Sequence, residues 1–207
     1  MWLQPGFAAN ARRIELTAPD AFEKRPVWQT RIAFVGMVTG FAVLALFGSR
    51  YGRFYGQTAL VSAALALVLL SLTWVDLDRF LLPDVLTLPL IAGGVAYSSL
   101  FGAGLWLSLA GALVGYSIVA GLALYWRRRF GREGIGLGDA KLLAGGGAWI
   151  GLFGVPLILL FASGSALLVV ALVALFGRRL DGKSVLAFGP MLALAIWAVW
   201  CLPFLVP

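Results

Sequence analysis

Long apolar runs, most of them close to the length needed to cross a lipid bilayer, dominate this sequence. Hydrophobic residues make up 61% of its 207 positions, whereas a soluble domain has about 45–50%. Crossing the hydrocarbon core as a helix takes roughly 17–25 residues. Seven windows approach this length, at about 32–48, 57–75, 85–101, 104–125, 141–154, 156–176 and 185–204. The sequence therefore predicts an all-α fold, a polytopic membrane helix bundle.

The fifth window is short, and glycines make its end poorly defined. Gly145, Gly146 and Gly147 lie within it, and Pro156 opens the next window, so it either forms its own helix or merges with the sixth. We expect six or seven transmembrane helices in a polytopic domain over residues 31–207. Residues 1–30 lack the apolar core of a signal peptide and are expected to form a cytoplasmic or interfacial tail.

Basic residues are distributed unevenly around these windows. If the N-terminus is cytoplasmic, all 16 lysines and arginines except Arg50 and Arg53 fall on the cytoplasmic side, as the positive-inside rule requires. This distribution accounts for the net charge of +7, so no nucleic-acid partner is expected. The acidic residues fall in the same cytoplasmic segments, which places Asp76 and Asp139 on one face of the membrane.

Tryptophans lie near the expected helix ends, where amphipathic rings often form an interfacial belt. The residues expected in that belt are Trp28, Trp74, Trp106, Trp126, Trp149, Trp197 and Trp200. Small residues are expected to let helices approach one another closely. They include Gly93, Gly94, Gly111, Gly115, Gly121, Gly145, Gly146 and Gly147.

The residues missing from the chain restrict its chemistry. Histidine is absent, which excludes Ser-His-Asp catalysis and histidine metal sites. Cys201 is the single cysteine, so neither an internal disulfide nor a Cys-x-x-C zinc site can form. We expect no metal and no cofactor, and catalysis is left to carboxylate, hydroxyl, lysine or tyrosine groups.

Two aspartates are the main candidates for catalysis. Asp76 stands at the cytoplasmic end of the second window, and Asp139 follows Gly136 and Gly138 at the entry to the fifth. Two carboxylates close together in a poorly hydrated cleft share one proton. An aspartyl protease uses such a pair: the ionised carboxylate takes a proton from water and the protonated partner polarises the amide carbonyl. Taken alone, Asp139 would more readily be an N-cap than a catalytic group.

Three neighbouring residues have structural and catalytic interpretations. Pro83 suits a turn or the first turn of the third window, and Asp84 is more readily an N-cap of that helix than a catalytic group. Lys141 either faces lipid headgroups or, with backbone N–H groups near Gly138, stabilises an oxyanion.

The chain resembles the type IV prepilin peptidase family of membrane aspartyl proteases. The matching elements are Val75-Asp76 with Leu82-Pro83-Asp84, then Gly136-Leu137-Gly138-Asp139-Ala140-Lys141, and Phe188-Gly189-Pro190 before the last window. The resemblance implies that Asp76 and Asp139 form the catalytic pair, with Pro83, Asp84, Gly136, Gly138, Lys141, Phe188, Gly189 and Pro190 supporting them. It also implies cleavage of the basic leader from type IV prepilins or type II secretion pseudopilins, at the cytoplasmic side of the bacterial inner membrane.

Two features depart from the pattern of that family. Many relatives carry a cysteine-containing cytoplasmic domain between the first two spans and also methylate the new N-terminus. The corresponding segment, residues 48–56, is too short for such a domain and contains no cysteine, so we expect the short form, a peptidase without N-methyltransferase activity. Ala187 stands where the family usually has proline.

Two alternatives come from other classes of protein. A presenilin-like GxGD intramembrane protease would place a tyrosine before the first aspartate and a Pro-Ala-Leu motif near the C-terminus, whereas Val75 precedes Asp76 and no such motif occurs. A non-enzymatic transporter or assembly factor could use intramembrane carboxylates as proton relays, although no repeated halves are evident.

Overall fold

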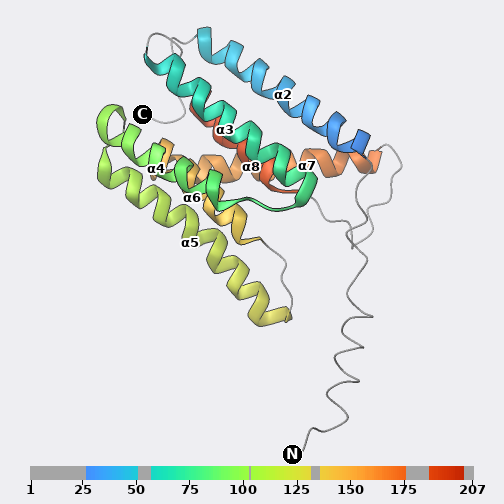
Figure 1. The fold of residues 1–207 in the computed structure, drawn as a ribbon. Helices are drawn as coiled ribbons and strands as arrows, with labels where there is room; N and C mark the ends of the chain where they lie inside the picture. The colour runs from blue at the N-terminus through green and yellow to red at the C-terminus, as the bar shows by residue number, and fades with distance from the viewer. Residues whose placement is uncertain (1–26, 51–56, 103, 132–135, 176–186, 203–207) are drawn as a thin grey trace, which may run out of the picture.

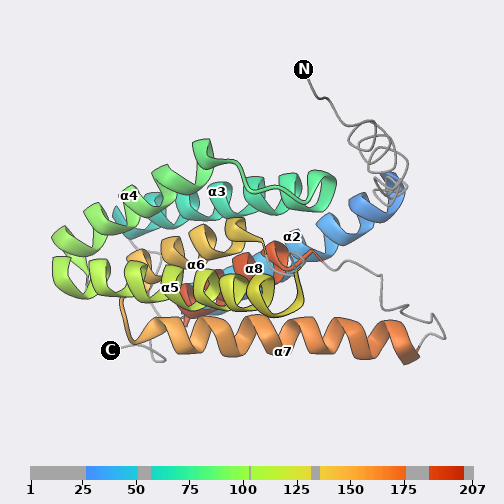
Figure 2. The ribbon, with the colours of Figure 1, turned by 90° about the horizontal axis from the view of Figure 1, so that it is seen from below.

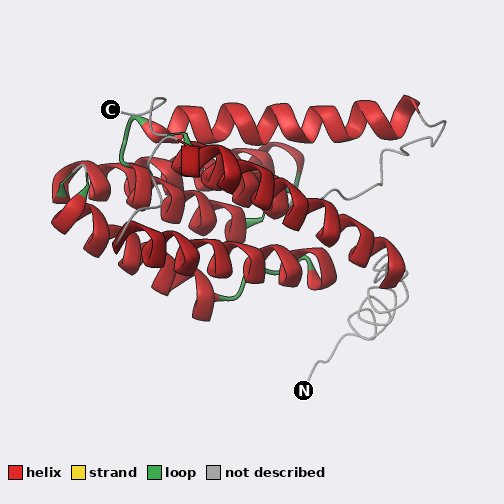
Figure 3. Ribbon diagram, turned by 90° about the horizontal axis from the view of Figure 1, so that it is seen from above, coloured by secondary structure: helices red, strands yellow, loops and turns green. Residues whose placement is uncertain are grey.

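The computed structural model describes residues 27–50, 57–102, 104–131, 136–175 and 187–202, which Figure 3 shows as helices joined by short connections. The helices are α2 (Val27–Arg50), α3 (Gln57–Arg79), α4 (Asp84–Phe101), α5 (Leu105–Phe130), α6 (Leu137–Ile150), α7 (Gly154–Leu175) and α8 (Gly189–Cys201). No strand occurs within these ranges. The predicted all-α membrane bundle is confirmed. Most of the tail predicted at residues 1–30 lies outside the described residues.

Four of these helices are long and apolar enough to cross a membrane, judged by length and composition. They cover Ala59–Arg79, Asp84–Phe101, Leu105–Phe130 and Gly154–Leu172. Two shorter apolar stretches, Thr30–Leu46 and Gly189–Cys201, lie in α2 and α8. The fifth and sixth predicted windows form separate helices, because Gly151 adopts a φ of 85° between α6 and α7.

Helices α6 and α8 occupy the middle of the bundle (Figures 1 and 2), and α7 runs along the face opposite α3 and α4 in Figure 2. Residues 142–148 of α6 are all buried, as are all but one of the residues of α8. A helix that is apolar on every side is covered either by neighbouring helices or by lipid, and here neighbouring helices cover both. The short α6 therefore forms, together with α8, the core on which the longer helices pack.

Glycines bring α4 and α5 close to α6. A Cβ added to Gly94 would lie 2.6 Å from the ring of Trp149 and 2.9 Å from the Cβ of Ala148. Cβ atoms added to Gly111 and Gly147 would each collide with the backbone of the opposite helix. The expected close approach is therefore confirmed at these three glycines. It is wrong for Gly121, where an added Cβ would meet nothing within 4 Å.

The predicted interfacial tryptophan belt is wrong for Trp149, Trp197 and Trp200. Trp197 and Trp200 are almost fully buried and Trp149 is half-buried. The indole N–H of Trp149 donates to Leu90 O at 2.8 Å, that of Trp197 to Phe41 O at 3.0 Å, and that of Trp200 to Ser62 Oγ at 2.9 Å. Because each ring finds a polar partner inside the bundle, it can lie in the core. Trp74, Trp106 and Trp126 remain exposed.

Candidate active site

Asp76 lies in the last turn of α3 and is only 6% exposed. The helix ends at Arg79, and Phe80 turns the chain with a φ of 53° while its N–H donates to Asp76 O at 2.9 Å. A bulky residue in this left-handed region costs about 1–2 kcal/mol. The turn thus holds the chain immediately after Asp76 in a conformation that α3 could not continue.

Asp139 lies in the first turn of α6, for which Gly136 is the N-cap residue. The N–H of Asp139 donates to Gly136 O at 3.2 Å, so the alternative that Asp139 itself caps this helix is wrong. Gly138 is needed for packing, because a Cβ at this position would lie 2.9 Å from the Cβ of Leu82. The glycines of the GxGD motif therefore start the helix and bring it against the α3–α4 turn.

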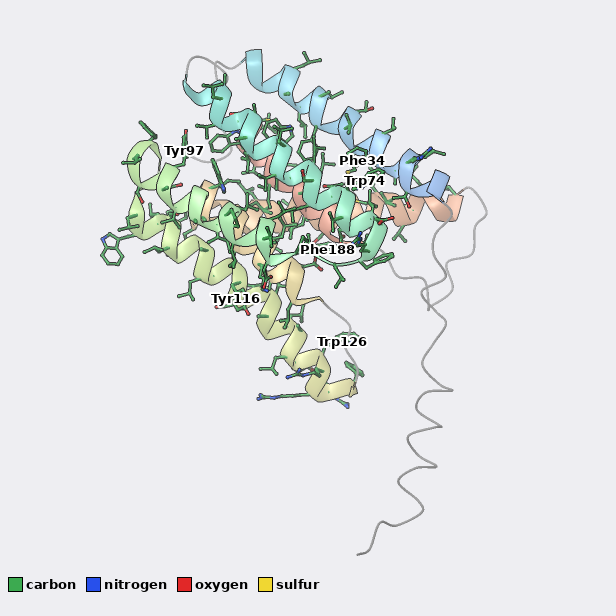
Figure 4. The ribbon with its side chains drawn as sticks, viewed as in Figure 1. Phe34, Trp74, Tyr97, Tyr116, Trp126 and Phe188 are labelled. Carbon is green, nitrogen blue, oxygen red and sulfur yellow. The ribbon has the colours of Figure 1, made fainter. Side chains whose placement is uncertain are left out.

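One cleft of about 1020 Å³ brings the two aspartates together. Its polar lining consists of Asp76, Asp139, Lys141, Arg127 and Ser163. Its apolar walls are the α3–α4 turn (Phe80, Leu81, Leu82), α5 (Ile118, Val119, Leu122, Ala123, Leu124), α7 (Leu159) and the approach to α8 (Ala187, Phe188). Figure 4 places Phe188 close to the end of α3 and Trp126 near the far end of α5.

Electrostatics couple the two carboxyl groups. Asp139 lies ahead of the fifth apolar window and outside the four long spans. Burial, and secondly the carboxylate of Asp76, raise the pKa of Asp139 to about 7. A pair of this kind holds one proton near neutral pH. Such a pair can supply both an acceptor and a donor of protons.

The Phe188-Gly189-Pro190 segment starts α8 beside Asp76. Phe188 is the N-cap residue, and Gly189 and Pro190 are buried in the first turn. A Cβ added to Gly189 would lie 2.6 Å from Asp76 Oδ2 and 2.9 Å from its Cγ. The predicted support residue Gly189 therefore leaves the space that the carboxyl group of Asp76 occupies.

Asp84 and Lys141 differ from their expected local roles. Pro83 is the N-cap residue of α4, and its carbonyl accepts from Leu86 N and Thr87 N at 3.0 and 3.2 Å. Asp84 makes no capping hydrogen bond, so the N-cap prediction is wrong; its carboxylate forms an ion pair with the ammonium of Lys141. Lys141 thus lines the cleft while its charge is compensated by α4.

Sequence reasoning missed the walls of the cleft. Ile118, Leu122 and Arg127 of α5 and Ser163 of α7 line it, yet these residues are spaced like any lipid-facing residues of a span. On the C-terminal side of Val119, no described residue of α5 is buried. A signal was present only for Arg127, which belongs to the basic run that sets orientation.

No group of three histidine, cysteine, aspartate or glutamate side chains that could hold a metal occurs among the described residues. Catalysis without a metal remains a prediction from the sequence.

Comparison with known proteins adds to this geometry. The model of the type IV leader peptidase family matches residues 63–174, a segment that contains both Asp76 and Asp139. The chain belongs to the type IV leader peptidase family. No solved structure shows a significant match.

Several curated relatives are each described as a prepilin leader peptidase/N-methyltransferase. The relative from Aeromonas hydrophila is 41% identical over 146 residues, which cover 69% of this chain and 49% of the relative. That from Neisseria gonorrhoeae is 32% identical over 171 residues, or 82% of this chain and 57% of the relative. That from Burkholderia pseudomallei (strain K96243) is 38% identical over 154 residues, or 72% and 47%. The chain therefore spans about half the length of these relatives.

Proposed function

We propose that this protein is a membrane aspartyl endopeptidase that removes the basic leader from type IV prepilins or type II secretion pseudopilins. The observation that carries the proposal is the convergence of Asp76 and Asp139, from separate helices, in one cleft of a leader peptidase family member. The names of the relatives support the substrate class.

The pair performs general acid–base catalysis on one water molecule. We assign the role of protonated acid to Asp139, because its pKa is raised to about 7, and the role of base to Asp76. Asp76 takes a proton from the water molecule while the water oxygen attacks the scissile carbonyl carbon. Asp139 gives its proton to the carbonyl oxygen. When the tetrahedral intermediate collapses, the C–N bond breaks, Asp76 gives a proton to the leaving amine, and Asp139 takes a proton back from one hydroxyl of the gem-diol. The products are a carboxylic acid and an amine, and the pair returns to its starting state. Cleavage therefore declines as pH rises above about 7, where Asp139 loses the proton it must donate.

The protein is further proposed to lie in the bacterial inner membrane with its N-terminus and active site on the cytoplasmic side. The basic residues support this orientation: Arg79 and Arg127 lie in the last turns of α3 and α5, whereas the sequence prediction leaves only Arg50 and Arg53 on the other side. The cleft lies on the same side as Arg127. A leader that is itself basic would remain on this cytoplasmic side.

We also propose that the protein lacks N-methyltransferase activity. The link between α2 and α3 contains only residues 51–56 and no cysteine, which leaves no room for a separate domain at that point.

Substitution of either aspartate tests the assignment. The full chain in detergent, mixed with a purified prepilin, is expected to release the leader at its junction with the apolar segment. Asp76→Asn and Asp139→Asn should each lower kcat by about a thousandfold or more, since each removes one partner of a unit that works jointly. Asp78→Asn is the matched control, because this exposed carboxylate pairs with Arg79 within the same turn of α3.

The site of cleavage, and whether cleavage survives the substitutions, distinguish the leader peptidase from the alternative classes of protein. Cleavage that survives either substitution contradicts the catalytic pair. A cut inside the apolar segment would indicate a presenilin-like protease, and no cleavage by the folded wild type would favour a transporter or assembly factor.

A further inference from the structure

The turn between α3 and α4 contacts both segments that carry the two aspartates, the end of α3 and the start of α6. It begins at Phe80, whose N–H is bonded to Asp76 O at 2.9 Å. Two residues later, Leu82 packs on Gly138, the residue before Asp139. This single turn is therefore in contact with both halves of the pair, and any shift of α6 against it changes the separation of the carboxyl groups.

Residues 142–148 of α6 are buried, but its first turn is less enclosed: Leu137 is exposed, and Gly138 and Asp139 are half-buried. At this turn Gly138 presents its backbone to Leu82, which is half-buried at the edge of the cleft. Close packing of Leu82 on the backbone of Gly138 prevents the two segments from moving closer together, but it resists sideways movement of one along the other less strongly. A directional interaction is needed to hold the first turn of α6 in register with the turn.

The ion pair between Asp84 and Lys141 provides such an interaction. It joins residues 57 positions apart, the first residue of α4 and the residue two positions after Asp139. The side chains of Lys141 and Asp84 are 31% and 58% exposed, and a pair at this exposure contributes little to the stability of a fold. Its location beside Asp76 and Asp139 suits it to position these two residues instead.

We propose that Asp84 and Lys141 are positioning residues, whose ion pair fixes the first turn of α6 on the α3–α4 turn and so sets the separation of Asp76 and Asp139. This inference rests on the proposed peptidase function. It also excludes Lys141 as the oxyanion-stabilising group considered from the sequence, because its ammonium is directed to α4.

The charges around the cleft make the inference measurable through pH. The charged groups that line the cleft with Asp139, within the described part, are Asp76 from α3, Arg127 from α5 and Lys141 from α6, and Asp84 of α4 is paired with Lys141; α7 and the start of α8 present Leu159, Ser163 and Phe188. If the pair of aspartates separates, their mutual repulsion weakens and the proton is released at a lower pH. Loss of the ion pair through Asp84→Asn, which also removes a negative charge, therefore moves the alkaline limb of the cleavage profile to lower pH.

Charge reversal separates positioning from direct contact. We expect Asp84→Asn and Lys141→Met each to lower kcat by about 10- to 100-fold, as small misplacements of catalytic groups do, with KM little changed. The double variant Asp84→Lys with Lys141→Asp should recover kcat to within about threefold of wild type, together with its pH profile. Asp78→Asn is again the matched control.

Three outcomes would overturn the inference. A double variant no better than either single variant would mean that Lys141 or Asp84 acts on the substrate directly. A change confined to KM would indicate substrate binding, and unchanged kcat in both single variants would remove any role. Loss of cleavage in the wild type would instead reject the proposed function.

A distance measurement tests the same contact without any activity. Spin labels on Leu81→Cys and Leu137→Cys report on the two sides of the contact, since both side chains are exposed; Cys201 is fully buried and stays unlabelled. The distance distribution should be narrow in the wild type, broader after Asp84→Asn, and narrow again in the charge-reversed double variant. An identical distribution in all three would contradict the positioning role even if the protein cleaved nothing.

Discussion

Asp76 is the residue whose surroundings were least visible in the sequence. Its position was predicted from its place at a membrane border, and its carboxyl group lies where Gly189 has no side chain. The Phe188-Gly189-Pro190 segment was named only through resemblance, with no physical role. The contact joins positions far apart in the chain, and no local pattern reports such a contact.

The close contact between Gly189 and Asp76 predicts the effect of replacing this glycine with alanine. Gly189→Ala would push a methyl group to within 2.6 Å of Asp76 Oδ2, so the carboxyl group must move; a shift of about 1 Å costs roughly a hundredfold in kcat. Cleavage of a prepilin by the purified variant, with its melting temperature, is the measurement. Gly36→Ala is the control, since an added Cβ there meets nothing within 4 Å. Wild-type kcat in Gly189→Ala would show that Asp76 does not need this space.

The N-cap prediction for Asp84 and the N-cap alternative considered for Asp139 failed for one reason. Each residue precedes an apolar window, which is the local signature of a cap. In the structure, Pro83 and Gly136 take those positions. Asp84 instead meets Lys141, and Asp139 faces Asp76 across the cleft. Local signatures identify a helix end within a residue or two, but tertiary partners decide what the side chain does there.

Helix α6 shows what the sequence could predict about an element. Its 14 residues were recognised as a short span with an uncertain end, and its glycines were expected to serve close packing. That expectation is confirmed where α5 crosses α6 backbone to backbone, at Gly111 and Gly147. The buried tryptophans were misplaced, because acceptors such as Phe41 O and Ser62 Oγ become neighbours only when the helices pack.

The crossing of α5 and α6 should not tolerate a single methyl group. Gly111→Ala would set its Cβ against the carbonyl of Gly147, and overpacking of this kind costs about 1–3 kcal/mol. We expect a lower melting temperature in detergent, measured by circular dichroism. Gly121→Ala, on the same helix but in open space, should leave stability unchanged or slightly raised because alanine favours helix. Equal stability of the two variants would contradict the crossing.

At the scale of the whole molecule, hydropathy and charge were sufficient to predict the class of fold from the sequence. The long apolar windows became helices, and the polar connections became turns. The cleft was beyond sequence reasoning, because its walls come from α5 and α7 and the positions that line them look the same as positions facing lipid. Only the packed bundle distinguishes the two.

The orientation of the bundle can be checked from its two ends. Phe130→Cys, just after the basic end of α5, should react with a membrane-impermeant thiol reagent only from the cytoplasmic side. Phe153→Cys, in the connection between α6 and α7, should react only from the opposite side. Both side chains are exposed, and the parent protein, whose Cys201 is fully buried, should not react. Labelling of both positions from one side would contradict the proposed topology.

The backbone contact between Gly111 and Gly147 has an evolutionary consequence. Because no side chain fills that crossing, mutation there has almost no tolerated alternatives, and the helix that carries Asp139 in its first turn is held to the same constraint. On the C-terminal side of Val119, the wall formed by α5 is not buried and is free to diversify. Under the proposed function, descendants of this protein could change the set of prepilins they accept through that wall while Asp76 and Asp139 stay unchanged.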